Sequence, residues 1–177
     1  NAREGTDLLR IIFNKGFVTG WVAIVSLAGV LYLLKFEKHE AQENIALYSY
    51  AITIAGIIVL YTVNFLELQY QLFEHGFDYA TQNNIIGSYN MLFMAGMLLV
   101  ARKLSVPAEL KAFFPALGVV AMLSYMFFYQ NQIISVRNDY VNGMDTFTGY
   151  IFHYVLLILL LLVVALSLTR VQKLSEF

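Results

Sequence analysis

The sequence predicts an all-α integral membrane protein with five transmembrane helices. Three observations lead to this prediction: a hydrophobic share of 59%, a charged share of only 13%, and the placement of the charges. The 11 basic and 12 acidic residues leave five uncharged stretches of 19 to 25 residues. A helix rises about 1.5 Å per residue, so about 20 apolar residues cross the roughly 30 Å hydrocarbon core of a bilayer. Each stretch is therefore long enough to span a membrane.

The spans are expected to be helices because backbone groups in hydrocarbon must pair within their own segment. Their apolar runs are continuous, whereas the strands of a membrane barrel alternate apolar and polar residues. Residues 1–16 mix apolar and charged side chains, which is typical of a short helix lying in the membrane interface. We therefore predict an interfacial segment at 1–16 and a transmembrane domain at 17–177. The predicted spans are 17–34, 45–66, 85–101, 112–129 and 147–169.

Glycine spacing indicates an internal repeat. Gly20 and Gly29 lie nine residues apart in the first span, and Gly87 and Gly96 lie nine apart in the third. The first and fifth spans both begin with Thr-Gly followed by an aromatic residue. This pattern predicts two repeated antiparallel hairpins plus a fifth helix that lacks its partner. Chance recurrence is the alternative, because glycine is common in membrane helices.

The distribution of Lys and Arg predicts the orientation. Seven of them lie in the connections after spans one and three and in the C-terminal tail, and four lie on the opposite side. Because cytoplasmic segments carry the excess of Lys and Arg, the short connections and the C-terminus are expected in the cytoplasm. The chain begins with Asn1 and has an odd number of spans, so we expect a fragment of a larger membrane protein, with a processed subunit as the alternative.

One group of polar side chains lies within or beside the spans. Asn64, Glu67 and Gln71 share a face at helical spacing. An ionisable side chain near hydrocarbon is a functional candidate, so Glu67 could bind a cation or relay a proton with Asn64 as its hydrogen-bond partner. The alternative is that Glu67 reaches water beyond the helix end. His153 lies well inside an uncharged stretch and could relay a proton or hydrogen-bond to a neighbouring helix.

A second group of candidates lies on the presumed outer face. The connections after spans two and four are rich in aromatic and amide side chains, which could bind a glycan or a lipid headgroup. The aromatic belt of membrane proteins has the same composition and is the alternative. The candidate contacts are Tyr79, Asn83, Arg137 and Tyr140.

The sequence contains no motif or composition that indicates other classes of function. The chain has no cysteine and a net charge of −1, so neither thiolate metal sites nor a nucleic-acid partner is expected. It has no phosphate-binding glycine loop and no hydrolase or metalloprotease motif. We therefore expect no metal, no cofactor and no enzyme contained in these residues. The expected partners are the lipid bilayer and other transmembrane helices, from the same parent chain, a partner subunit or a second copy.

Three short segments carry a family resemblance. They are Phe-Asn-Lys-Gly-Phe-Val-Thr-Gly at 13–20, Phe-Leu-Glu-Leu at 65–68 and Ile-Gly-Ser-Tyr at 86–89. Together they resemble a large many-helix "predicted membrane protein" family of bacteria, whose function is unknown. The resemblance implies a piece of a longer helical array in the bacterial inner membrane. It implies no activity and no catalytic residues.

Three functional hypotheses follow. The first is a non-catalytic helical module of a larger membrane protein or complex. The second is a transporter or permease fragment with Glu67 in an ion or proton path. The third is glycan or lipid-headgroup handling on the outer face.

Overall fold

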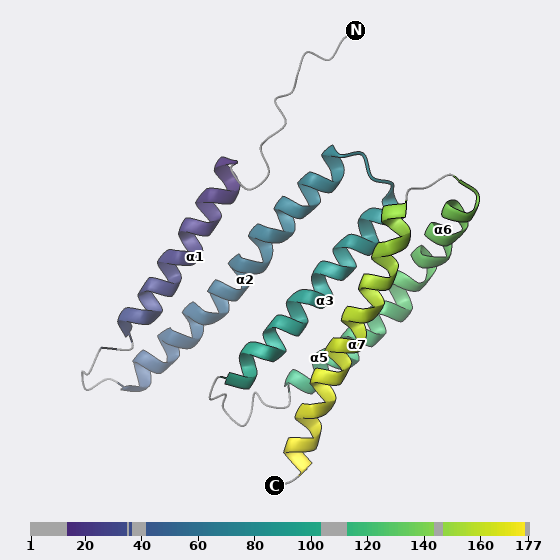
Figure 1. The fold of residues 1–177 in the computed structure, drawn as a ribbon. Coiled ribbons are helices and arrows are strands. Elements are labelled where there is room, and N and C mark those ends of the chain that lie inside the picture. Colours follow the sequence, from purple (N-terminus) through teal and green to yellow (C-terminus); the bar gives the residue numbers. More distant parts are fainter. Residues whose placement is uncertain (1–13, 35, 37–41, 104–112, 144–146, 176–177) are drawn as a thin grey trace. The chain divides into compact units, whose positions relative to one another are not determined.

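A computed structural model describes residues 14–34, 36, 42–103, 113–143 and 147–175. These residues form helices and no strand, which confirms the all-α prediction (Figure 1). Within the described ranges, five helices are long and apolar enough to cross a bilayer, so the chain is a multi-pass membrane protein. Most of the predicted interfacial helix at 1–16 lies outside the described residues. The five candidate spans are Lys15–Leu34, Leu47–Glu74, Tyr79–Ala101, Pro115–Val141 and Phe147–Thr169.

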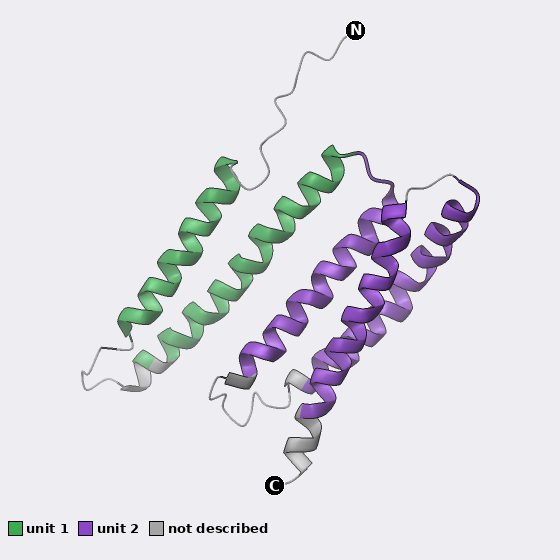
Figure 2. Cartoon of the chain, viewed as in Figure 1, with its two compact units in different colours: residues 1–75 green, residues 76–177 purple. Residues whose placement is uncertain are grey.

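The chain divides into two compact units, residues 1–75 and 76–177 (Figure 2). The second unit starts at Gly76, whose φ of 67° is a left-handed conformation that glycine adopts without steric cost. The transmembrane domain predicted at 17–177 therefore contains helices of both units.

Unit 1 is a helical hairpin of α1 (Lys15–Leu34) and α2 (Gln42–Glu74). Near the start of α1, a Cβ atom at Gly20 would come within 2.5 Å of the Val63 side chain, near the end of α2. The two helices are therefore antiparallel and in close contact where glycine allows it, as predicted for the first hairpin.

Unit 2 contains α3 (Tyr79–Lys103), α5 (Phe113–Ser124), the π-helical turn η1 (Tyr125–Tyr129), α6 (Gln130–Val141) and α7 (Phe147–Ser175). The helix α7 packs against both α3 and α5, and α3 has its largest contact with α7. The fifth helix, which the sequence predicts as the first helix of a third hairpin, therefore packs against other helices within unit 2. Glycine spacing along the chain could not reveal this, because packing between α3 and α7 depends on contacts far apart in the sequence.

Regular spacing of buried residues explains the contact between α3 and α7. Along α3 the buried positions alternate steps of three and four residues, the spacing by which a helix keeps one stripe against a parallel neighbour. The α3 stripe is Thr81, Asn84, Ser88, Met91, Ala95 and Leu98. The facing α7 stripe includes Leu156, Leu160 and Val163. The apolar members of both stripes form the core of unit 2.

The fourth span is longer than predicted and changes geometry along its length. We predicted it over 112–129, but the described helix continues through η1 and α6 to Val141. Within the described part, the departure from α-helical geometry is η1. A π-helical turn inserts an extra residue and changes which side chains face a neighbour. Tyr129 ends η1, and its ring lies against Gly87 of α3.

Both long connections predicted from the sequence are mostly helical. The helix α2 continues beyond residue 66 to Glu74, and α3 already begins at Tyr79. The sequence criterion selected uncharged segments, whereas helices extend past the hydrocarbon core into the interface, where polar side chains are tolerated. The aromatic and amide side chains predicted for loops therefore lie largely on helix ends.

Candidate functional site

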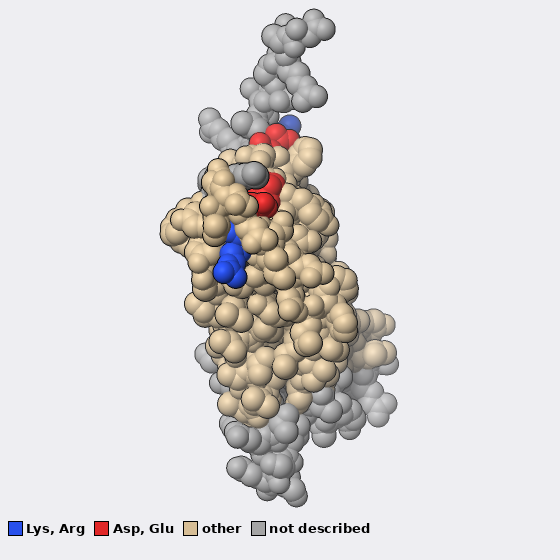
Figure 3. Space-filling view, turned by 90° about the vertical axis from the view of Figure 1, so that its right-hand side faces the viewer, with Lys and Arg blue, Asp and Glu red and all other residues tan. Residues whose placement is uncertain are grey.

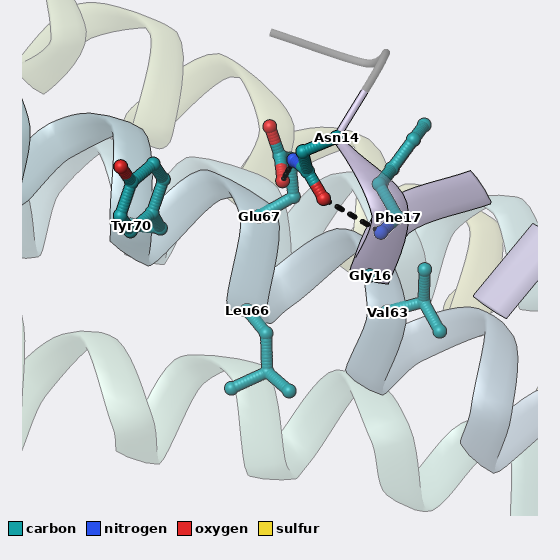
Figure 4. Close-up of a pocket in the computed structure, with 7 residues that line it drawn as sticks. All are labelled: Asn14, Gly16, Phe17, Val63, Leu66, Glu67 and Tyr70. Atoms are coloured by element: carbon teal, nitrogen blue, oxygen red, sulfur yellow. Dashed lines mark hydrogen bonds between the residues drawn. The ribbon is translucent and has the colours of Figure 1, made fainter. Parts of the chain in front are cut away.

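Glu67 lies at the centre of a hydrogen-bonded group in unit 1. Its carboxylate accepts one bond from the Asn14 side-chain amide, with Nδ2 to Oε2 at 2.5 Å, and one from the Gln71 amide, with Nε2 to Oε1 at 2.8 Å. Glu67 and Gln71 are one turn apart on α2. Asn14 immediately precedes α1, and its side chain lies beside Glu67 (Figure 4). The group therefore joins the start of α1 to the last third of α2.

Asn14 is held by the beginning of α1. Its side-chain Oδ1 accepts the backbone N–H of Phe17 at 2.8 Å, and its backbone carbonyl accepts the N–H of Val18 at 3.1 Å. This is the geometry of an N-cap, in which a short polar side chain satisfies an N–H group of the first helical turn. Because Oδ1 is used for the cap, Nδ2 is left to donate to Glu67. Asn14 is only 8% exposed, so both interactions are sheltered from solvent.

A shallow pocket of about 290 Å³ adjoins this group (Figure 4). Its wall is mostly apolar, and Glu67 is the one carboxylate among the described residues that line it. Among the described residues no cationic side chain forms an ion pair with Glu67, so its hydrogen-bond donors are neutral amides. The lining residues are Asn14, Gly16, Phe17, Val63, Leu66, Glu67 and Tyr70.

The structure brings together only part of the polar group predicted from the sequence. Glu67 and Gln71 do interact, but Asn64 donates its side-chain amide to the Leu60 carbonyl of its own helix at 2.7 Å. The hydrogen-bond partner predicted for Glu67 was therefore wrong: Asn14 takes that role. His153 belongs to α7 in unit 2, whereas the Glu67 group belongs to unit 1.

His153 lies beside a buried polar layer between α3 and α7. Ser88 donates its hydroxyl to the Asn84 carbonyl at 2.8 Å and lies 3.5 Å from the carbonyl of Phe152, the neighbour of His153. Asn84 is 0% exposed, and within the described part of the chain neither polar atom of its side chain has a hydrogen-bond partner. The same holds for Nδ1 of His153. One end of the α3–α7 contact is thus polar, and the other is apolar.

The four candidates on the presumed outer face separate into two pairs in unit 2. Tyr79 and Asn83 lie one turn apart at the start of α3, with Tyr79 exposed. Arg137 and Tyr140 lie one turn apart on α6. The Tyr140 ring stacks on Tyr150 of α7, with ring centroids 4.7 Å apart and an angle of 14° between the rings.

Sequence reasoning missed several residues of these groups. Asn14 could have been recognised as an N-cap, because it directly precedes an apolar helical run. Asn84 and Ser88 could have been found from their spacing within the α3 stripe. Tyr150 and Tyr154 lie four apart, and their hydroxyl oxygens are 2.9 Å apart. Their connection to α6 depends on how two helices pack and has no local signal.

Comparison with protein families, curated proteins and solved structures finds no match for this chain. Within the described residues, no three His, Asp or Glu side chains gather as the ligands of a metal ion would. The function must therefore be argued from the residues themselves.

Proposed function

We propose that this chain is a non-catalytic helical module of a larger membrane protein or complex. The observation that carries the proposal is that polar side chains within the spans form their hydrogen bonds to helix backbone and to each other. Glu67 is the carboxylate best placed for a chemical role. It accepts hydrogen bonds from Asn14, which caps α1, and from Gln71 of its own helix. Six other polar side chains bond to a carbonyl one turn earlier in their helix: Thr19, Ser26, Thr53, Asn64, Ser88 and Ser167. These groups serve helix structure and packing.

The surface of unit 1 supports the assembly part of the proposal. No residue of α1 is buried, and much of the apolar surface of α2 is exposed. Gly20 of α1 lies against the Val63 side chain of α2. Gly29 and Gly56, in contrast, have no described atom near the position of a Cβ atom. Small residues let membrane helices approach closely, so these two positions suit contact with further helices.

We also propose that the module lies in the bacterial inner membrane with a cytoplasmic C-terminus. Support for the orientation is the excess of Lys and Arg in the short connections and the C-terminal tail. Support for the bacterial membrane is the family resemblance of segments 13–20, 65–68 and 86–89.

Substitutions in the Glu67 group test the structural role. A glutamine at position 67 keeps one acceptor oxygen but sets its own NH₂ group against an amide donor. We expect Glu67→Gln to lower the free energy of unfolding in detergent by about 1 kcal/mol, and Glu67→Ala by about 2 kcal/mol. Asn14→Ala should cost about 1–2 kcal/mol through loss of the cap and of the bond to Glu67.

A double-mutant cycle isolates the contact itself. Because Asn14 and Glu67 share a hydrogen bond, the effects of Asn14→Ala and Glu67→Ala should be non-additive by roughly 0.5–1 kcal/mol. Glu74→Gln, at an exposed carboxylate on the same helix, is the matched control and should leave stability unchanged. Additive effects of the two alanine substitutions would contradict a shared structural role.

A proton or cation path through Glu67 is the second candidate function. It is favoured by the pocket beside Glu67 and by its neutral donors, since no described residue supplies the carboxylate with a fixed countercharge. The same variants decide between the two functions in vesicles loaded with a pH-sensitive dye. A proton path predicts faster acidification with the unmodified chain and none with a folded Glu67→Gln variant. The module predicts that both match protein-free vesicles.

A further inference from the structure

The aromatic stack between α6 and α7 fixes the register of these two helices. Successive helices joined by a short turn run antiparallel, and the Tyr140 ring stacks on the Tyr150 ring at 4.7 Å. The residue one turn before Tyr140 on α6 and the residue one turn after Tyr150 on α7 must then lie at the same level along the two helices. These positions are Arg137 and Tyr154. Arg137 shares a face of α6 with Tyr140, and Tyr154 shares a face of α7 with Tyr150, because positions three and four residues apart are neighbours on a helix.

The groups at this level are hydrogen-bond donors. The Tyr150 and Tyr154 hydroxyl oxygens are 2.9 Å apart, so one hydroxyl donates to the other and the accepting hydroxyl keeps its own hydrogen. Arg137 is exposed, and in the described part of the chain it forms no ion pair with a carboxylate. Asp139 lies two residues further along α6, on a different face, where Ser135 donates to it at 3.2 Å. The arrangement therefore offers a guanidinium and a phenol hydroxyl to an anion.

The position in the chain identifies the anion. Arg137 lies in the last turn of the fourth span, which ends at Val141, and the fifth span begins at Phe147. Span ends lie at the membrane interface, where lipid headgroups carry their phosphates. A guanidinium binds phosphate through two parallel N–H bonds. On the side that faces the viewer in Figure 3, the described residues form small basic and acidic patches within a surface that is mostly uncharged.

We propose that Arg137, together with the Tyr150–Tyr154 hydroxyl pair, binds the phosphate group of a phospholipid headgroup. Tyr140 supports the site by stacking on Tyr150, which holds that phenol in place. The site uses two of the residues expected to contact a headgroup, Arg137 and Tyr140, and it adds two from α7. It is independent of the module function, since a structural lipid and a packing role are compatible.

Binding of a short-chain phosphatidic acid tests the proposal. The whole chain is purified in a maltoside detergent, which has no phosphate, and lipid adducts are quantified by native mass spectrometry. We expect Arg137→Gln to weaken binding by about tenfold, since it removes a charge-assisted pair of bonds. Tyr154→Phe should weaken it a few-fold, roughly the loss of one hydrogen bond. Arg137→Lys, which keeps the charge without the planar fork, should lie between Arg137→Gln and the unmodified chain.

Controls separate the site from general attraction to lipid. Lys15→Gln removes an exposed cation at the start of α1 and should leave binding unchanged. A diacylglycerol with the same acyl chains lacks the phosphate and should bind about tenfold more weakly than the phosphatidic acid. Two outcomes would overturn the proposal: equal binding by Arg137→Gln and the unmodified chain, or inorganic phosphate binding as tightly as the lipid, which would make the ligand a free ion.

Discussion

At the scale of single residues, Asn14 uses both ends of its side-chain amide. One end caps α1, and the other donates to Glu67 of α2. The sequence predicted that Glu67 and Gln71 share a helix face, because i and i+4 positions are neighbours on any helix. It did not identify Asn14 as the partner of Glu67, because that contact joins residues 53 positions apart and depends on the packing of α1 and α2.

At Asn84 we predict a substitution that stabilises the protein, in contrast to the destabilising substitutions at Asn14 and Glu67. Its side chain is 0% exposed, and no described residue bonds to its amide atoms. A buried polar group without a partner costs free energy, so an apolar residue of similar size removes that cost. We expect Asn84→Leu to raise the free energy of unfolding by about 1 kcal/mol, measured by thermal unfolding in detergent.

The neighbouring Asn83 supplies the comparison for this substitution. It lies on another face of α3 and is only partly buried, so Asn83→Leu should change stability little. A loss of stability in Asn84→Leu alone would mean that the Asn84 amide has a favourable hydrogen-bond partner in the membrane. The polar layer between α3 and α7 would then stabilise the fold.

At the scale of helices, glycines divide into those that contact a neighbouring helix and those that do not. A Cβ atom at Gly87 would come within 2.6 Å of the Tyr129 ring, whereas Gly96 on the same helix has no described atom within 4 Å. The sequence predicted that Gly87 and Gly96 repeat the spacing of Gly20 and Gly29. It could not distinguish Gly87 from Gly96, since the difference arises from the contact with Tyr129, which belongs to another helical segment far along the chain.

The same substitution at these two glycines should have opposite effects. Gly87→Ala must displace the Tyr129 ring, and overpacking of this kind costs about 1–3 kcal/mol. Gly96→Ala meets open space and gains helix propensity, roughly 0.5–1 kcal/mol in favour of folding. Thermal unfolding of both variants by circular dichroism measures the difference. Equal effects of the two substitutions would contradict the close contact at Gly87.

At the scale of the whole molecule, charge-free stretches predicted the number of spans because hydrocarbon excludes charges over a fixed thickness. They did not predict helix ends, since α2 and α6 continue into the interface. Nor did they predict that unit 2 packs around α7, because spans of similar composition give no signal for their partners. In a bilayer the hydrophobic effect does not favour contact with a helix over contact with lipid. Side-chain packing and hydrogen bonds therefore decide which helices pack together.

The central claim, a module that packs against further helices, is tested most directly at Gly56. The chain has no cysteine, so Gly56→Cys provides a single attachment point for a maleimide photo-crosslinker in native membranes. Ile58→Cys, on another face of α2, is the matched reference. Mass spectrometry then identifies what the label joins. We predict a transmembrane peptide from outside these 177 residues at Gly56. Label attached only to lipid, or only to peptides of this same sequence, would contradict the claim.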